Sequence, residues 1–368
     1  MPQPNVSNLK HILAFAQSFH RGGVELALLR LAEGWRRAGR RVTLVVGSTA
    51  GPLSIEIPPG VETVELGSSD YGALRQKLPG IVREMRPDLL FCAGNHYTGV
   101  AAWAWLMLGH DCPPIVGKVS NSLVRPDHGA LARWGYRRWL RIHPWFLDHV
   151  VAMTPATAAE AMREMGLEAD RVSVIPNPPA MPITGAEPVA IPAGRYIIGV
   201  GRLEPQKRWE RLIAAMPRLA DAGVTLTILG EGSLRSELEA QIAALGLTGR
   251  VFLPGHAADP LPLVQAATVL ALTSDFEGVP GVLREALALG TPVVATDSSV
   301  SVREIVHSPA LGTVIDRDDA EGLIAALDHW LAPEAIRPEP ATHEGDPVAD
   351  YLALFDRVVA QRHPERAW

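Results

Sequence analysis

Two glutamates in the second half of the chain stand where their carboxylates could bind a ligand. In SDFEGVPGVLREALALG, residues 274–290, Glu277 lies in a turn containing glycine and proline, and Glu285 follows eight residues later. The residues around Glu285 have the spacing of an apolar helix face, where an unpaired buried carboxylate would be costly. Carboxylates only accept hydrogen bonds and suit the hydroxyls of sugars and ribose. Surface charge is the simpler interpretation of two glutamates, but a buried Glu285 would need a partner or a ligand hydroxyl.

Two cations occupy a second candidate loop. In YIIGVGRLEPQK, residues 196–207, an apolar strand delivers Gly201, and Arg202 and Lys207 follow on one short loop. Two cations five residues apart at the carboxyl end of a strand suit a diphosphate, although solvated surface charge is common for both residue types. The loop lacks the G-x-x-x-x-G-K-[ST] pattern of the ATPase phosphate loop.

Glycines mark other strand ends. Gly22 and Gly23 precede a helix whose exposed amides could bind an anion, and Gly230 and Gly255 each end a further strand. By themselves these glycines indicate turns, and Ser233 is expected to cap the helix after Gly230. In a cleft that already holds two cations, they would supply backbone groups for a base or phosphate. The pattern G-x-G-x-x-G is absent after the first strand, so no hydride chemistry is indicated.

The elements that must position these residues form two α/β domains. Short, continuous apolar runs alternate with segments of helical period, which is typical of parallel sheets buried on both faces. The expected strands are 11–16, 42–47, 61–65, 88–92, 114–118 and 148–153, then 195–200, 225–229, 250–253, 268–272, 292–296 and 312–315. The expected helices of the second set are 208–222, 233–245, 280–289 and 318–331.

A proline-rich linker separates the two sets. We expect a first Rossmann-like domain over 1–178, a linker over 179–194, a second domain over 195–344 and a final segment over 345–368 with a helix at 347–362. Ligands of open α/β sheets bind at the carboxyl ends of strands, so the loops above should meet there.

Composition excludes several classes of protein. The 368 residues are 47% hydrophobic with a net charge of -6, which does not indicate nucleic-acid binding. Cys92 and Cys112 have no partner pattern and are expected to be buried thiols of a reduced, cytoplasmic protein. The first residues do not read as a signal peptide, and the most apolar window, VAAWAWLMLG, is far shorter than the ~20 residues of a membrane span.

The motifs together resemble a known family. The ordered set GGVE, VIPNP, GRLEPQK, ILGEGSLRSELE and FEGVPGVLREALALGTPVVATD is similar to family 4 of the retaining nucleotide-sugar glycosyltransferases, which have the GT-B fold. The resemblance covers nearly the whole chain and is most specific in the second domain. It implies two Rossmann-like doubly wound domains facing a central cleft, with the acceptor on the first domain and the donor mainly on the second. It also implies that the final helix packs back on the first domain.

Residue roles follow from the same resemblance. Arg202 and Lys207 would clamp the donor diphosphate, Glu277 would face the donor sugar and Glu285 would bind the ribose. The implied catalytic residues are Arg202, Lys207 and Glu277. The implied donor-binding set is Gly22, Gly23, Gly201, Arg202, Lys207, Gly230, Gly255, Glu277, Gly278, Val279, Pro280, Gly281, Val282 and Glu285. Catalysis would be electrostatic, without a protein nucleophile, cofactor or metal.

The chain departs from the family pattern at two places. A histidine that members often carry after the fifth strand is replaced by Asn121, and His96 in GNHYTG is the candidate substitute on the acceptor side, with a turn or capping role as its alternative. The Gly-Gly that often follows the TD of the last motif is replaced by SSVSVRE. The D-x-D in DRDD, residues 316–319, indicates a helix cap at Asp318 rather than a metal site.

One basic, aromatic segment bears on the acceptor. Residues 131–146, LARWGYRRWLRIHPWF, suit either an anionic membrane surface or an ordinary domain helix with arginines over apolar neighbours. With membrane contact, the acceptor would be lipid-linked and the enzyme would sit at the inner face of the cytoplasmic membrane.

The sequence predicts transfer of a sugar from a UDP- or GDP-sugar to a glycan or lipid-linked acceptor. A nucleotide-sugar epimerase and a non-catalytic nucleotide- or glycan-binding protein remain the alternatives.

Overall fold

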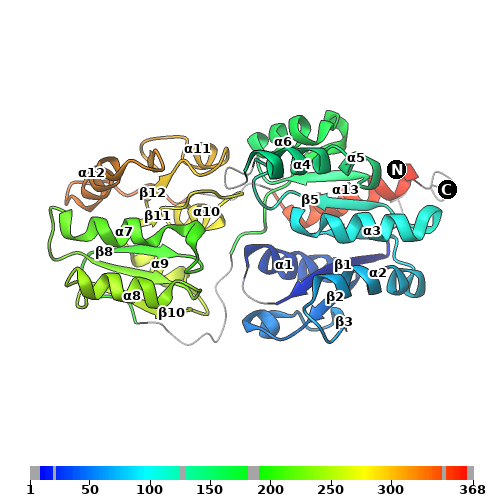
Figure 1. Cartoon of the computed structure of the whole chain (residues 1–368), viewed down its shortest axis with the longest axis horizontal. Coiled ribbons are helices and arrows are strands. Elements are labelled where there is room, and N and C mark those ends of the chain that lie inside the picture. The colour runs from blue at the N-terminus through cyan, green and yellow to red at the C-terminus, as the bar shows by residue number, and fades with distance from the viewer. Residues whose placement is uncertain (1–8, 20–21, 125–128, 181–189, 342–344, 363–368) are drawn as a thin grey trace, which may run out of the picture. The chain divides into compact units, whose positions relative to one another are not determined.

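The computed structural model describes residues 9–19, 22–124, 129–180, 190–341 and 345–362. The chain divides into two compact units, Met1–Pro178 with Gly345–Trp368, and Pro179–Glu344 (Figure 1). Most of the expected linker falls on residues 181–189, outside the described part of the chain.

The first unit is a parallel sheet surrounded by helices. Its seven described strands have the order β3-β2-β1-β4-β5-β6-β7 (Figure 1). The strands are β1 (His11–Ser18), β2 (Arg41–Ser48), β3 (Glu62–Glu65), β4 (Leu89–Cys92), β5 (Ile115–Lys118), β6 (His149–Ala152) and β7 (Val172–Val174). The helices are α1 (Gly23–Arg37), α2 (Tyr71–Met85), α3 (Thr98–Leu108), α4 (Ala130–Leu140), α5 (His143–Phe146), α6 (Pro155–Ala161) and α13 (Pro347–Arg362).

The second unit repeats this arrangement. Its six described strands have the order β10-β9-β8-β11-β12-β13. They are β8 (Tyr196–Val200), β9 (Thr225–Leu229), β10 (Val251–Gly255), β11 (Val269–Leu272), β12 (Val293–Thr296) and β13 (Gly312–Ile315). The helices are α7 (Trp209–Ala215), α8 (Arg235–Ala244), α9 (Leu261–Ala266), α10 (Gly281–Ala288), α11 (Val302–Ile305) and α12 (Ala320–Leu331). The doubly wound α/β fold is therefore confirmed.

The central strands are buried on both faces, as their continuous apolar runs predict. Strands β4, β5, β6, β11 and β12 consist of buried residues throughout. In contrast, β7 is a three-residue edge strand whose residues are half-buried or exposed. It therefore has no apolar run from which the sequence could predict it. Helices α9 and α11 are too short for a helical period to stand out.

Helix α13 belongs to the core of the first unit. Tyr351 and Phe355 are fully buried and meet the ring of Trp35 at 5.8 and 5.2 Å between centroids. Gly34 permits this approach, because a Cβ atom there would lie 2.3 Å from a methyl carbon of Val348. The last helix thus completes the unit that begins with the first strand.

Three local expectations were wrong. Helix α7 ends at Ala215, followed by a 3-10 turn with Pro217, and does not reach 222. Asp319, rather than Asp318, caps α12 by accepting a hydrogen bond from the N–H of Gly322 at 2.8 Å. Ser233 does not cap α8, because its hydroxyl donates to Glu204 at 2.8 Å.

Candidate functional site

A largely buried ion pair lies at the carboxyl edge of the second sheet. The Nζ of Lys207 is 2.6 Å from Oε1 of Glu277, and the two side chains are only 15% and 11% exposed. Lys207 ends the turn after β8, and Glu277 lies in the loop after β11. Because β8 and β11 are adjacent and their crossovers run in opposite directions, this pair stands where the strand order reverses, which is the usual ligand position in such sheets.

The Glu277 carboxylate is fixed by a second donor. The hydroxyl of Ser274 donates to the same Oε1 atom at 2.6 Å. The loop of Glu277 is also tied to the loop of Lys207, since Gln206 Nε2 donates to the carbonyl of Phe276 at 2.7 Å. The two loops are therefore preorganised as one unit, with cation and carboxylate already in place.

The glycines at the strand ends have packing reasons for their identity. A Cβ atom on Gly230 would lie 1.9 Å from the carbonyl oxygen of Gly201, and the N–H of Gly230 donates to the carbonyl of Gly255 at 2.8 Å. Gly255 has φ of +90°, a conformation that side chains rarely adopt. The structure thus brings the ends of β8, β9 and β10 together through bare backbone.

The remaining predicted donor residues differ in accessibility. Arg202 is exposed, and its carbonyl accepts a hydrogen bond from the indole of Trp209 at 2.9 Å. Glu285 is half-buried on α10 and already interacts with a polar or charged group of the chain. Glu285 therefore has a partner within the chain, which is one of the two alternatives expected for a buried carboxylate at this position. Gly278 to Val282 lead from Glu277 into that helix.

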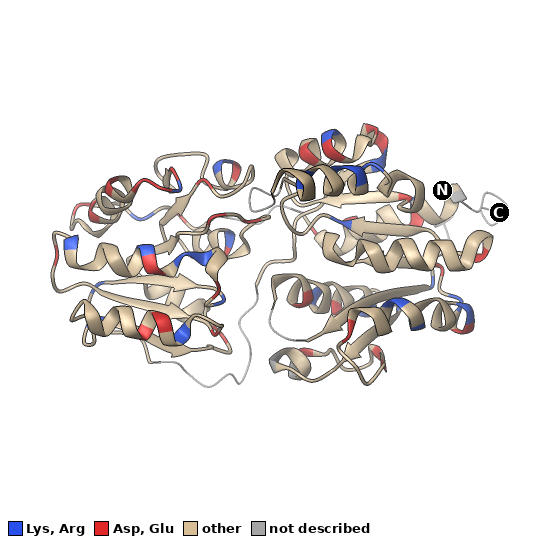
Figure 2. Ribbon diagram, viewed as in Figure 1, with Lys and Arg blue, Asp and Glu red and all other residues tan. Residues whose placement is uncertain are grey.

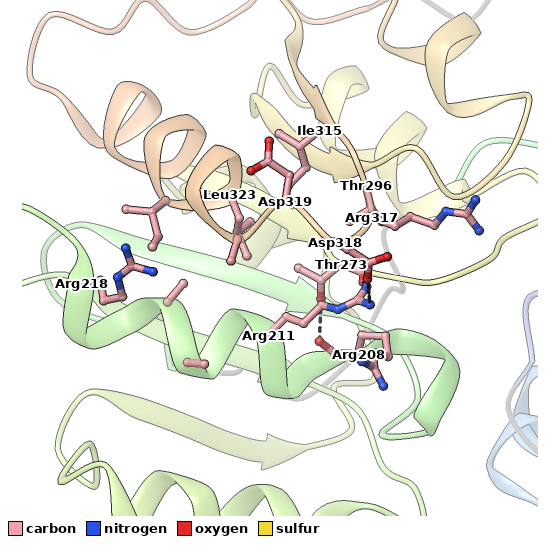
Figure 3. Close-up of a pocket in the computed structure, with 14 residues that line it drawn as sticks. Arg208, Arg211, Arg218, Thr273, Thr296, Ile315, Arg317, Asp318, Asp319 and Leu323 are labelled. Atoms are coloured by element: carbon pink, nitrogen blue, oxygen red, sulfur yellow. Dashed lines mark hydrogen bonds and ion pairs between the residues drawn. The ribbon is translucent and has the colours of Figure 1, made fainter.

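Sequence reasoning missed a charge network behind these loops. Arg211 on α7 is 2.8 Å from Asp275 and also 2.8 Å from Asp318. Figure 3 shows Arg211 beside Asp318. Arg211 also donates to the carbonyl of Thr273 at 3.4 Å, and Arg317 donates to the carbonyl of Asp275 at 3.2 Å. Arg211, Arg317 and Asp318 border a cavity of about 260 Å³ between α7 and α12. Asp318 therefore forms an ion pair with Arg211, and no pattern in the sequence around either residue predicts this pairing.

The first unit gathers polar groups at the carboxyl ends of β1, β4 and β5. Glu25, the glutamate of GGVE, accepts a hydrogen bond from the hydroxyl of Tyr97 at 3.0 Å, and that hydroxyl accepts one from the N–H of Gln17 at 2.9 Å. The Nε2 of His96 is 4.0 Å from Glu25. Gly22 is the N-cap residue of α1. It lies against the Glu25 carboxylate, since a Cβ atom on Gly22 would be 2.3 Å from Oε2 of Glu25.

The second acceptor-side candidate, Asn121, adjoins His96 through Asn95. The Oδ1 of Asn95 accepts from the N–H of Asn121 and from the hydroxyl of Ser120, both at 3.0 Å. The Nδ2 of Asn95 donates to the carbonyl of Asn121 at 3.3 Å. Asn95 therefore holds the turn that contains Asn121, and sequence reasoning did not identify it.

A buried lysine lies close to this turn. Lys118 ends β5, and its ammonium donates to the side-chain oxygen of Asn177, in the VIPNP motif. Burial lowers the pKa of Lys118 to about 7. Sequence reasoning overlooked this residue, because a lysine at a strand end usually reaches solvent.

Lys118 makes the stability of the first unit depend on pH. Between about pH 7 and the ordinary lysine pKa near 10.4, the unfolded chain binds a proton that the native chain lacks, so stability rises with pH. The free energy of unfolding of the wild type, relative to Lys118→Met, should therefore increase from pH 7 to pH 10 in urea titrations. Lys77→Met, at an exposed lysine, should show no such trend. A constant difference between wild type and Lys118→Met across this range would contradict the assignment.

Clusters that could hold a metal ion are absent from the described ranges of the chain, where no three His, Cys, Asp or Glu side chains come together. Within the same ranges no helix is long and apolar enough to cross a membrane.

Known proteins match both units. Residues 187–342 match the family model described as glycosyl transferases group 1, and residues 21–178 match the model of glycosyltransferase family 4. The Campylobacter jejuni N-acetylgalactosamine-N,N'-diacetylbacillosaminyl-diphospho-undecaprenol 4-alpha-N-acetylgalactosaminyltransferase is 34% identical over 39% of this chain and 39% of its own. The lipopolysaccharide core biosynthesis glycosyltransferase LpsE of Rhizobium meliloti is 33% identical over 38% of this chain and 41% of its own. The chain thus spans about two fifths of the length of these relatives.

Solved structures agree in fold over nearly the whole chain. Anabaena HepE in complex with UDP and glucose superposes with a TM-score of 0.70 at 23% identity, covering 96% of this chain and 95% of that one. Two family models that match consecutive halves, together with the two Rossmann-like units, place the chain among the family 4 type glycosyltransferases of the GT-B fold.

Proposed function

We propose that the protein transfers a sugar from a UDP- or GDP-sugar to a hydroxyl of a glycan or lipid-linked glycan, with retention of configuration at the anomeric carbon and without a metal ion. The observation that carries the proposal is the ion pair of Lys207 and Glu277 at the point where the strand order of the second sheet reverses. A cation and a carboxylate side by side at that point match the two ends of a sugar diphosphate.

The roles follow from charge and hydrogen-bonding capacity. Lys207 and the exposed Arg202 stabilise the charge that develops on the leaving diphosphate. Glu277 accepts hydrogen bonds from the donor sugar, and Glu285 accepts them from the ribose. The backbone N–H groups after Gly278 donate further hydrogen bonds to the donor. Lys207 already neutralises the charge of Glu277. The ion pair is therefore ordered before the donor binds, and the donor only has to replace the solvent around it.

The first unit takes the acceptor in this proposal. At its strand ends Tyr97 donates a hydrogen bond to Glu25, and His96 lies 4.0 Å from the same carboxylate, with Asn121 nearby. Gly22 and Gly23 are further proposed donor contacts at the start of α1.

The names of similar proteins support the substrate class. One relative's name specifies a diphospho-undecaprenol-linked sugar as the acceptor, another's specifies lipopolysaccharide core biosynthesis, and HepE was solved with UDP and glucose. We infer a role in the synthesis of cell-surface polysaccharide, lipopolysaccharide or glycolipid, in the cytoplasm at the inner face of the membrane.

Helix α4 supports contact with that membrane. Of its eleven residues only Leu140 is buried, and Leu131 and Trp134 are 82% and 59% exposed. Figure 2 shows basic residues along the helix, and the guanidinium of Arg138 lies over the ring of Trp134 at 5.4 Å. Exposed apolar and basic side chains on one helix suit the interface of an anionic bilayer.

Donor turnover tests the proposal. The protein is incubated with UDP- and GDP-sugars, with and without lipid extract, and nucleotide release is measured. We expect release with at least one donor, and a loss of about 10²-fold or more in Lys207→Ala and Arg202→Ala, because each removes a preorganised electrostatic contact. Arg218→Ala, which removes an exposed cation of the same unit, should retain wild-type turnover.

Four outcomes contradict the assignments. No release with any donor would overturn the transferase, and conversion of the donor without release would indicate an epimerase. Nucleotide binding without release or conversion would indicate a binding protein. Full activity of both lysine and arginine variants would refute the proposed diphosphate site.

Vesicle binding tests the surface of α4. We expect the protein to float with vesicles containing phosphatidylglycerol and not with neutral phosphatidylcholine vesicles, with binding weakened by salt. Trp134→Ser and Arg137→Ser should each reduce flotation, whereas Arg83→Ser on α2 should not. Equal flotation of all variants, or none for the wild type, would favour an ordinary domain helix.

A further inference from the structure

Two serines of the segment SSVSVRE, which stands where the family often has Gly-Gly, lie against the loop of Glu277. Ser299 and Ser301 follow β12, and their hydroxyls are 2.7 and 2.6 Å from the carbonyl oxygen of Gly278. Ser301 is completely buried and Ser299 is half-buried. Two side chains of one loop therefore converge on a single peptide of another.

The two hydroxyls act as one group. Their oxygens are 2.8 Å apart, so three short contacts share two protons. Either both hydroxyls donate to Gly278, whose carbonyl oxygen has two lone pairs, or one donates to the other and only the second reaches the carbonyl. In both arrangements at least one hydroxyl holds the Gly278 carbonyl, and removing one serine leaves the other able to do so.

This contact sets the direction of the next amide. The C=O of Gly278 and the N–H of Val279 belong to one peptide plane, and the described chain contains no cis peptide bond. In a trans peptide the C=O and N–H point in opposite directions. Holding the carbonyl toward the serines therefore turns the Val279 N–H away from them. Within the described part of the chain that N–H has no hydrogen-bond partner.

The same serine loop also fixes the peptide between Phe276 and Glu277. The N–H of Glu277 donates to the carbonyl of Ser298 at 3.0 Å. Residues 298–301 thus restrain the peptides on both sides of the Glu277–Gly278 peptide bond, one through a backbone contact and the other through side-chain contacts.

We propose that Ser299 and Ser301 are positioning residues that aim the Val279 N–H at the sugar nucleotide. This inference rests on the proposed function, because it assumes that the donor binds beside Glu277. The serines touch neither donor nor acceptor; they act through the Gly278 peptide, and the amide they orient stabilises negative charge on the reacting donor.

The test is a split between binding and turnover. The donor is whichever sugar nucleotide the wild type turns over, and binding is measured with the corresponding UDP or GDP. Ser299→Ala/Ser301→Ala should lower kcat about tenfold, less than the loss of about 10²-fold from removing a complete preorganised donor, because the amide is misdirected and not deleted. The nucleotide Kd should change less than about twofold, since the remaining contacts stay in place.

Matched variants separate positioning from stability. The hydroxyl of Ser298 is buried without a hydrogen-bond partner among the described residues, so Ser298→Ala removes a hydroxyl from the same loop without releasing Gly278. Each single alanine variant should lose less than the double variant, and Ser299→Thr, which keeps the hydroxyl, should retain kcat. Where the double variant does not fold, Ser299→Ala and Ser299→Thr are compared with melting temperatures measured alongside.

Several results would overturn the inference. Wild-type kcat in the double variant, an equal loss in Ser298→Ala, or a loss that follows only the melting temperature would each do so. Absence of turnover in the wild type would overturn the proposed function and this inference with it, whereas turnover that is insensitive to the serines overturns the inference alone.

Discussion

The ion pair of Lys207 and Glu277 is the contact on which the site of the second unit depends. Its two side chains are mostly withdrawn from water, and its distance of 2.6 Å requires that both loops be held in register. Breaking such a pair by removing one partner leaves an uncompensated charge, which is much costlier than losing an exposed pair. The hydrogen bonds of Ser274 and Gln206 and the charge network of Arg211 can be understood as the supports that keep these loops together.

The fold explains why the supports come from distant parts of the sequence. Lys207, Glu277, Ser301 and Asp318 follow β8, β11, β12 and β13 in turn, and parallel pairing puts all four strand ends at one edge. The loops therefore meet although more than a hundred residues separate the first from the last. Bare glycine backbone at the ends of β8, β9 and β10 lets the neighbouring strand ends approach closely.

Much of this could be predicted from the sequence. Continuous apolar runs predicted every central strand, and the strand-end loops carried the residues that the family resemblance singled out. Contacts between side chains distant in sequence could not be read in the same way. The neighbouring sequence does not distinguish Arg211 from other helix arginines, Asp319 from Asp318 as a cap, or Lys118 from a solvated lysine. The role of each residue depends on contacts with segments that are distant in the sequence. Glu285 is a further example. The spacing of its neighbours predicts an apolar helix face, but in the structure Glu285 is half-buried and has a partner.

A crystal structure with an unhydrolysed sugar nucleotide tests the central claim most directly, namely that the donor binds at the Lys207 and Glu277 loops. The account predicts the diphosphate within hydrogen-bonding distance of Lys207 and Arg202, the sugar hydroxyls on Glu277 and the ribose on Glu285. A nucleotide bound elsewhere, with the Lys207–Glu277 pair unchanged and facing solvent, would contradict it.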